Sequence, residues 1–207
     1  MYNMRRTKEE AAVTRATLMK TALSVFSVKG YAAATLEDVA KAAKVTRGAI
    51  YWHFKSKAEL YNILVLEFSE RGAAVVQQAV AEGGTLIEIL RRVFIRQCAL
   101  IEEDKEARAV MELALFKTGL EPELQPGRKK QLEAGNALVS GLTDAMQQGI
   151  AQGVLRKDID PADMARAFLA LENGAIQMWL VSPRSFSLKA SAESFAKILV
   201  SGLQKQR

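Results

Sequence analysis

Apolar residues recur at helical spacing along almost the whole chain, and short breaks marked by Gly or Pro separate these stretches. Positions three and four apart share one face of a helix, so each stretch predicts an amphipathic helix rather than a strand. The predicted helices cover residues 8–29, 36–43, 47–54, 56–82, 85–103, 105–119, 128–152, 161–182 and 188–204. The pattern therefore predicts an all-α fold of nine helices.

Local start and stop signals set the helix boundaries. Gly30 is expected just after the first helix, and Gly83 and Gly84 are expected to end the fourth. Asp160 followed by Pro161 is a strong start signal, because Pro lacks the N–H that the first turn leaves unpaired. Further breaks are expected at Pro122, Pro126, Gly153 and Pro183.

The most informative segment is residues 35–57, TLEDVAKAAKVTRGAIYWHFKSK, in which two short helical patterns meet at a tight turn. Thr35 and Thr46 are well placed as N-caps of the two helices. Ile50 and Phe54 are four residues apart, so they are expected to pack inward together. This arrangement is typical of a helix-turn-helix, whose second helix enters the major groove of duplex DNA.

The outward residues of the second helix carry the chemistry of recognition. They are Arg47, Gly48, Tyr51, Trp52 and His53. An Arg side chain can donate two hydrogen bonds to guanine, and an aromatic ring can contact a thymine methyl. Gly48 removes side-chain bulk where the helix approaches the bases, and Lys55 and Lys57 are placed for phosphates. The alternative, that YWHF packs within a core, requires adjacent polar-tipped rings to face one side of a helix.

The segment VTRGAIYWHFKSKAEL, preceded by TLEDVAKAAK, closely resembles the N-terminal signature of TetR-family repressors. The stretch RRTKEEA at residues 5–11 is similar to the AcrR-type regulators of multidrug efflux pumps. The resemblance implies a TetR-like fold with a three-helix DNA-binding domain, residues 1–55, and an effector-binding and dimerisation bundle, residues 56–207. The family usually has Gly where Lys44 stands, so we expect a left-handed backbone at Lys44, at a cost of about 1 kcal/mol.

The expected DNA contacts divide into base and phosphate contacts. Arg47, Tyr51 and Trp52 are expected to meet bases or their methyl groups. Tyr51 and three other side chains, those of Thr46, His53 and Lys57, are expected to anchor to phosphates. A flexible N-terminal arm is expected to reach a neighbouring minor groove. The complete predicted set is Arg5, Arg6, Thr35, Thr46, Arg47, Gly48, Tyr51, Trp52, His53 and Lys57.

The distribution of charge supports DNA binding independently. The net charge is +6, and residues 1–60 hold 11 Lys and Arg against 5 Asp and Glu, while residues 61–207 hold 18 of each. A basic domain on a neutral body is typical of a nucleic-acid reader. A membrane surface would also attract it, but the basic segment lacks a wide amphipathic face and no apolar stretch is long enough to span a bilayer. Cys98, the only cysteine, lies in an apolar run and predicts a buried inert thiol in a reducing, cytoplasmic setting.

The last two predicted helices indicate a dimer. Residues 161–182 are apolar on nearly every side, and residues 188–204 carry a stripe of Phe195, Ile198, Leu199, Gly202 and Leu203. A helix that is apolar all round must be covered on both sides. We therefore expect a homodimer in which these helices form a four-helix bundle, so that two helix-turn-helices read a palindromic operator.

The resemblance also implies an effector cavity in the C-terminal bundle. Polar residues inside apolar runs, such as Glu172 in FLALENGAIQMWL, are the usual anchors of a ligand site. The predicted lining is Phe68, Phe94, Gln97, Met111, Glu112, Leu115, Phe116, Asn173, Gln177 and Trp179. Such a lining suits small apolar or aromatic effectors. The alternative is that these residues simply fill a core.

Three functional readings remain open at this point. The favoured one is a ligand-responsive repressor of a transporter or efflux operon. A regulator of other metabolic genes, or an activator without a small effector, is the second. An enzyme is the third, but the chain shows no nucleophile–base pair, phosphate-binding glycine loop or metal-ligand spacing. No cofactor and no metal site are predicted.

Overall fold

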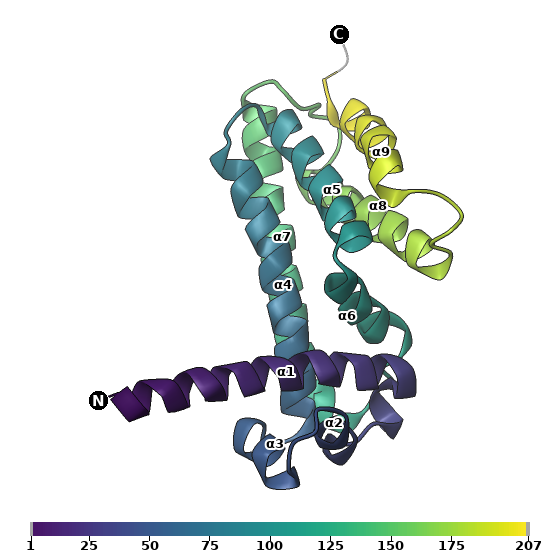
Figure 1. Ribbon diagram of the computed structural model, residues 1–207. Helices are drawn as coiled ribbons and strands as arrows, with labels where there is room; N and C mark the ends of the chain where they lie inside the picture. The colour runs from purple at the N-terminus through teal and green to yellow at the C-terminus, as the bar shows by residue number, and fades with distance from the viewer. Residues whose placement is uncertain (1, 206–207) are drawn as a thin grey trace. The chain divides into compact units, whose positions relative to one another are not determined.

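The computed structural model describes residues 2–205, with side chains from Lys8 onward. These residues form nine α-helices and one short 3₁₀ helix, which confirms the predicted all-α fold (Figure 1). The elements are α1 (Tyr2–Ala33), α2 (Leu36–Ala42), α3 (Arg47–His53), α4 (Lys57–Ala81), α5 (Leu86–Glu103), α6 (Lys105–Phe116), η1 (Pro122–Leu124), α7 (Gln125–Ala151), α8 (Pro161–Val181) and α9 (Leu188–Leu203).

One boundary differs from the sequence prediction for a clear physical reason, and one predicted break is present inside a longer helix. The loop expected at Pro126 is absent, because α7 already begins at Gln125. Pro is tolerated at the second position of a helix, where its missing N–H has no partner to lose. The break that the sequence predicts at Gly30 is present, because Gly30 has non-helical backbone angles, φ 75° and ψ 162°, and α1 resumes beyond this kink as far as Ala33.

The chain divides into two compact units. The first unit comprises Met1–Ser69 and Ala109–Gly127, and the second comprises Glu70–Arg108 and Arg128–Arg207. Helices α4, α6 and α7 each contribute to both units. This division by packing differs from the functional division at residue 55 that the sequence predicts, which stays a prediction about function.

In the first unit, α1, α2 and α3 pack around one hydrophobic core. Helix α2 lies in contact with both α1 and α3. The core takes in Val110 and Leu113 from α6. The Tyr31 amide also donates to the Lys117 carbonyl at 3.0 Å, and the Lys117 ammonium donates to the Ser27 carbonyl at 2.6 Å. The helix-turn-helix is therefore fixed on both α1 and the end of α6.

In the second unit, α5 packs along α9, and α8 packs against both. The rings of Phe94 on α5 and Phe168 on α8 meet edge to face, with centroids 6.0 Å apart. At the end of α7, a Cβ on Gly149 would lie 2.7 Å from Leu86 Cδ2 and 2.9 Å from Leu155 Cγ. Gly149 therefore permits the close approach of α7 to α5.

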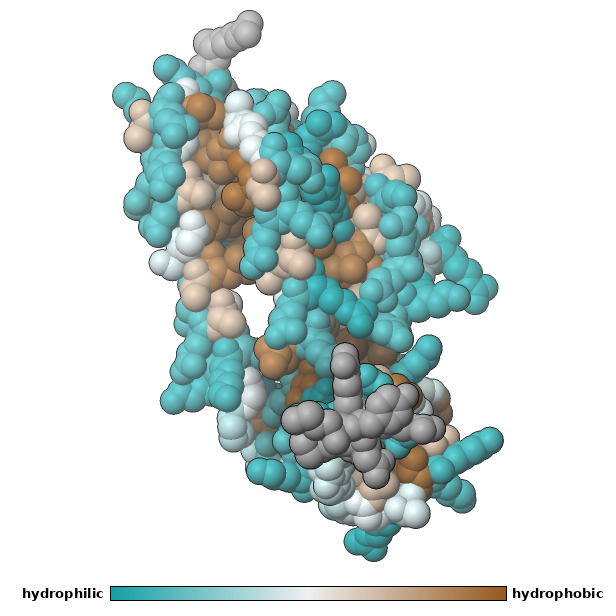
Figure 2. All heavy atoms as spheres, turned by 60° about the vertical axis from the view of Figure 1, so that its left-hand side comes forward, coloured by the Kyte–Doolittle hydropathy of each residue, from teal (hydrophilic) through white to brown (hydrophobic). Residues whose placement is uncertain are grey.

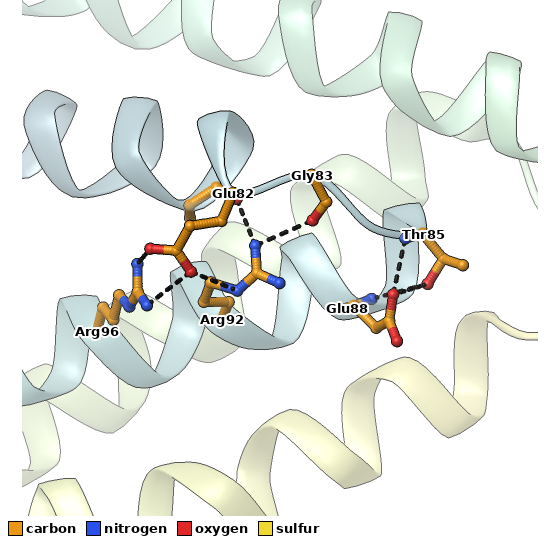
Figure 3. Close-up of polar contacts among 7 residues, drawn as sticks. Glu82, Gly83, Thr85, Glu88, Arg92 and Arg96 are labelled. Atoms are coloured by element: carbon orange, nitrogen blue, oxygen red, sulfur yellow. Dashed lines mark hydrogen bonds and ion pairs between the residues drawn. The ribbon is translucent and has the colours of Figure 1, made fainter.

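A network of ion pairs and caps closes the corner between α4 and α5 (Figure 3). The Arg92 guanidinium donates to the Ala79 carbonyl at 2.6 Å and to the Gly83 carbonyl at 3.1 Å, so it caps the end of α4. The Arg96 guanidinium donates to both carboxylate oxygens of Glu82, at 2.6 and 2.9 Å. These contacts hold the last turn of α4 against α5.

Within the part of the chain that the structure describes, no helix is both long enough and apolar enough to cross a membrane.

Candidate nucleic-acid interface

The first helix of the helix-turn-helix begins at a complete capping box. The Asp38 amide donates to Thr35 Oγ1 at 3.1 Å, and the Thr35 amide donates to Asp38 Oδ2 at 3.0 Å. The Lys29 ammonium donates to Asp38 Oδ1 at 2.6 Å, which lowers the pKa of the Asp38 carboxyl together with the Thr35 bonds. Thr35 therefore acts as the cap that the sequence predicts, and the ion pair of Lys29 with Asp38 ties α2 to α1.

The turn between α2 and α3 has the backbone that the sequence predicts. Lys44 has φ 56°, and among the described residues it is the one non-glycine residue in the left-handed region. The Val45 amide donates to the Ala40 carbonyl at 3.0 Å, and this bond closes the turn. The turn therefore keeps its geometry although Lys stands where Gly would fit without strain.

The second helix, α3, begins at Thr46 and is anchored by its apolar side. Thr46 Oγ1 accepts from the Ala49 amide at 3.1 Å, which leaves its hydroxyl hydrogen available to a phosphate oxygen. Ile50 and Phe54 are completely buried, as predicted. Arg47, Gly48, Tyr51 and Trp52 are exposed, and the Trp52 side chain is 74% exposed.

The guanidinium of Arg47 is held between α2 and α3. It forms an ion pair with the Glu37 carboxylate at 3.1 Å, and it lies 5.6 Å from the centroid of the Tyr51 ring. Both charged side chains are largely exposed. The ion pair is therefore weak in water, but it restricts the directions in which Arg47 reaches outward.

His53 is less exposed than the sequence predicts. Its ring is half-buried, 4.6 Å from the Trp52 ring and 6.2 Å from the Phe54 ring. Burial, and then the positive charge of Arg15, lower the pKa of His53. The ring is therefore neutral at pH 7, so a phosphate contact from His53 would be a neutral hydrogen bond.

Lys57 already has partners in the first unit. Its ammonium donates to the Tyr31 carbonyl at 2.9 Å and to the Ala32 carbonyl at 3.2 Å, and it lies 4.3 Å from the centroid of the Tyr31 ring. These contacts join the start of α4 to the end of α1. A phosphate contact from Lys57 stays a prediction, and it would have to share the ammonium with these carbonyls. The side chains of Arg5 and Arg6 lie outside the described residues.

The residues predicted to line an effector cavity fall into both units. Phe68, Met111, Glu112, Leu115 and Phe116 belong to the first unit, and Phe94, Gln97, Asn173, Gln177 and Trp179 belong to the second. In the first unit, Phe68 packs against the core, while Leu115 and Phe116 are exposed and Met111 and Glu112 are half-buried.

The predicted residues of the second unit differ in burial. Phe94 and Trp179 are buried, and the Trp179 indole donates to the Phe186 carbonyl at 3.1 Å. The half-buried Gln97 amide donates to the Gly72 carbonyl at 2.9 Å. Asn173 and Gln177 are exposed on the face of α8 opposite to Trp179, and therefore do not point into the unit.

Apolar side chains are also exposed on α8 and α9. Met178 and Val181 on α8 are 67% and 74% exposed, and Ile198 on α9 is 68% exposed. Leu203, expected in the subunit interface, is instead buried within the second unit, because α9 packs on α5. Exposed apolar side chains on neighbouring helices are typical of an interaction surface.

No group of acidic, histidine or cysteine side chains suited to a metal ion occurs among the described residues. Burial, followed by the charges of Glu172 and Glu102, raises the pKa of the Cys98 thiol to about 12. Cys98 is buried, as the sequence predicts, and the thiol is unreactive at neutral pH.

Two segments of the chain match known protein families. Residues 18–63 match the bacterial regulatory proteins of the tetR family, and residues 86–205 match the C-terminal region of MAATS-type transcriptional repressors. The chain is 30% identical to the HTH-type transcriptional regulator AcrR of Shigella flexneri, over 95% of this chain and 92% of that protein. It is 32% identical to TtgR of Pseudomonas putida, over 93% of this chain and 92% of that protein.

Solved structures share the fold. NalD of Pseudomonas aeruginosa superposes with a TM-score of 0.85 at 23% identity, over 96% of this chain and all of that chain. SmeT, from Stenotrophomonas maltophilia, in its triclosan complex superposes with a TM-score of 0.80 at 25% identity, over 94% and 93% of the two chains. With a helix-turn-helix that presents Arg47, Tyr51 and Trp52, and with both family matches, the chain belongs to the TetR family of bacterial transcriptional regulators.

Proposed function

We propose that this protein is a repressor that binds a palindromic operator as a homodimer and leaves it when a small apolar or aromatic effector binds. The observation that carries the proposal is the α3 surface, on which Arg47, Tyr51 and Trp52 are exposed beside a fully buried Ile50 and Phe54. An Arg beside exposed aromatic side chains is suited to the recognition of bases, because Arg can donate to guanine and an aromatic ring can contact a thymine methyl.

The regulated genes that we propose are those of a multidrug efflux pump. NalD is described as the secondary repressor of the MexAB-OprM multidrug efflux pump, and SmeT as the repressor of the SmeDEF pump. A probable acrEF/envCD operon repressor of Escherichia coli is 31% identical over 91% of this chain. Control of metabolic genes is the second candidate, since the fatty acid metabolism regulator of Bacillus subtilis also aligns, but at 23% identity.

The proposed division of labour assigns DNA binding to residues 1–55 and effector binding and dimerisation to residues 56–207. The DNA-contacting set is that predicted from the sequence, with Lys57 shared between its carbonyl partners and a phosphate. The subunits pair through α8 and α9, where Met178, Val181 and Ile198 are exposed. Burial of these side chains against a second copy removes apolar surface from water.

The effector site that we propose lies in the helical bundle that follows α3. Figure 2 shows hydrophobic atoms gathered over the second unit, in the upper half of the view, between hydrophilic side chains. An apolar area with a polar rim is typical of a ligand-binding or partner-binding surface. SmeT has been solved with triclosan, which makes triclosan a suitable first probe for this chain.

Helix α4 is the proposed link between effector and operator. It is one continuous helix of 25 residues that begins four residues after the end of α3. Its last turn is fixed to α5 by Arg92 and by the pairing of Arg96 with Glu82 (Figure 3). A displacement of α5 by an effector would thus move α4, and with it the helix-turn-helix. Such a coupling of about 1–3 kcal/mol weakens operator binding roughly 5–150-fold.

The test begins with duplexes selected by the protein from a randomised DNA library. Arg47→Ala should weaken binding to the selected duplex by about 1–3 kcal/mol and broaden base preference at one position of each half-site. Lys129→Ala removes a positive charge from an exposed position of α7 and serves as the control. Unchanged base discrimination after the loss of Arg47 would contradict the assignment of α3 as the reader.

The effector part is tested separately by titrating triclosan into the complex of protein and selected duplex. Release of the duplex at concentrations at which triclosan binds the free protein supports the proposal. Binding of triclosan without any change in operator affinity would contradict effector control by this class of compound.

A further inference from the structure

A cavity that takes no part in the proposed function opens beside the loop between α7 and α8. The loop passes the end of α9 (Figure 1), where Leu155 and Gln204 form an antiparallel bridge. The cavity has a volume of about 440 Å³, and all the residues that line it belong to the second unit. Its size lies within the usual range of small-molecule sites.

The backbone around the cavity is fixed by the way in which α7 ends. Gly153 has φ 70°, and its amide donates to the Ile150 carbonyl at 2.9 Å. The Val154 amide donates to the Gly149 carbonyl, also at 2.9 Å. This pair of bonds is a Schellman motif, which needs a left-handed residue and therefore favours Gly. On the other side, the Lys205 amide donates to the Val154 carbonyl at 3.4 Å, so hydrogen-bonded backbone bounds the cavity.

The floor of the cavity is apolar and its rim is charged. Leu155 is 2% exposed, and Ile150 is half-buried. On the rim, Arg156 Nε donates to Asp158 Oδ1 at 2.7 Å, and Arg156 Nη2 donates to Asp158 Oδ2 at 2.5 Å. This bidentate pair lowers the pKa of the Asp158 carboxyl to about 2. Asp158 therefore stays ionised, and the charge of Arg156 offsets its own.

The two lysines that line the cavity have no such partner. Within the described residues neither Lys157 nor Lys205 forms an ion pair, and both are exposed. With Arg156, they place three positive charges around the cavity against the one negative charge of Asp158. The carbonyls at the end of α7 do not offset this excess, because they accept the bonds of the Schellman motif. The cavity therefore attracts anions.

We propose that this cavity binds a small organic dianion, such as a phosphate ester, with its charged group between Lys157 and Lys205 and its apolar part on Ile150 and Leu155. A doubly charged group matches the excess of positive charge, and its oxygens accept from the ammonium groups. The apolar floor favours an organic ligand over an inorganic one, because hydrocarbon buried against it is removed from water. The inference goes beyond the proposed function, since the site involves neither operator nor effector.

The experiment uses three probes that share a naphthalene ring and differ in charge. Near pH 8, 2-naphthyl phosphate carries two negative charges, because the second pKa of a phosphate ester is about 6. 2-Naphthyl sulfate carries one negative charge, and 2-naphthol is neutral. Binding to the full chain is measured by equilibrium dialysis without DNA. Affinity should fall in the order phosphate, sulfate, naphthol, and added salt should weaken binding of the phosphate by screening exposed charges.

The combination of Lys157→Ala and Lys205→Ala removes both unpaired ammonium groups. Because an exposed ion pair contributes up to about fivefold, this double variant should bind 2-naphthyl phosphate roughly 5- to 25-fold more weakly than the wild type. Its affinity for 2-naphthol should not change. The matched control combines Lys129→Ala and Lys130→Ala, which removes the same charge from exposed positions of α7 outside the cavity. Lys157→Arg with Lys205→Arg retains both charges and should retain the affinity.

A second readout follows from mass action. A ligand that binds only the folded protein raises its melting temperature. 2-Naphthyl phosphate should therefore raise the melting temperatures of the wild type and of the control variant. It should raise that of the variant without Lys157 and Lys205 much less at the same concentration.

Four outcomes would contradict the site. Equal affinity of the wild type for 2-naphthyl phosphate and 2-naphthol would overturn it, as would equal affinity of the lysine variant and its control for the phosphate. Displacement of 2-naphthyl phosphate by an equal concentration of inorganic phosphate would overturn the assignment of an organic ligand. Loss of operator affinity in the lysine variant, with probe binding intact, would assign the two lysines to DNA instead. Since binding is measured without DNA, failure of the proposed repressor function would leave the probe results unchanged.

Discussion

Gly48 offers a substitution that separates stability from DNA recognition. It is exposed at the second position of α3, and a Cβ placed there would find its nearest neighbour, Thr46 Oγ1, at 3.9 Å. The backbone has no positive φ at this position. Ala is therefore accommodated without strain, and because Gly is disfavoured in helices, Gly48→Ala should stabilise the free protein by about 0.5–1 kcal/mol.

The same methyl group should weaken operator binding. If α3 lies in the major groove with Gly48 towards the bases, the added methyl occupies space that the DNA needs. The helix must then withdraw, and the hydrogen bonds of Arg47 to a base are the first contacts to lengthen. Loss of one bidentate contact costs about 1–3 kcal/mol, which corresponds to a fall in affinity of roughly 5–150-fold.

Two measurements on one variant check this prediction. Thermal unfolding should show a melting temperature equal to or above that of the wild type, and titration with the selected duplex should show the loss of affinity. Gly135→Ala makes the same change in open space on α7 and should stabilise the protein without affecting DNA binding. A Gly48→Ala protein that is stable and binds the operator as tightly as the wild type would refute the close approach of the α3 backbone to the bases.

Four further substitutions test the turn, the packing of α7 and, in two cases, the subunit interface. Lys44→Gly should raise the free energy of unfolding by up to about 1 kcal/mol, because Lys44 has φ 56°; a destabilised variant in denaturant titration would contradict this. Gly149→Ala should cost about 1–3 kcal/mol through overlap with Leu86, and an unchanged melting temperature would show that α7 and α5 separate freely. Ile198→Asp should convert a dimer into monomers in sedimentation and reduce operator binding with it, since the charge would be buried without a partner; a folded variant that stays dimeric would place the interface elsewhere. Met178→Ser, on α8, is the milder companion variant and should weaken the dimer less.

The sequence by itself determined the positions of the helices and identified the helix-turn-helix. Helical spacing is a local property, so each stretch predicted its own helix, and Thr35 and Thr46 marked the two caps that the structure contains. The left-handed backbone at Lys44 was also predictable, because the family that the segment resembles usually has Gly at that position. Ile50 and Phe54 could be assigned to the core from their spacing alone.

Only the tertiary structure decided which polar groups are already engaged. Lys57 is placed for a phosphate in the sequence, but the fold brings its ammonium to the carbonyls of Tyr31 and Ala32, 26 and 25 residues away. The positive charge of Arg15, 38 residues earlier in the chain, acts together with burial to lower the pKa of His53. Such contacts join residues that are distant along the chain, and no local pattern encodes them.

The same holds for the second unit. Asn173 and Glu172 are adjacent in one apolar run, and the sequence gives no reason to separate them. The packing of α8 on α5 and α9 turns Glu172 inward, where its carboxyl has no partner, and leaves Asn173 exposed, where its amide donates to the Leu169 carbonyl at 2.8 Å. A single helical step of about 100° decides between the two environments, and which face turns inward is set by the neighbouring helices.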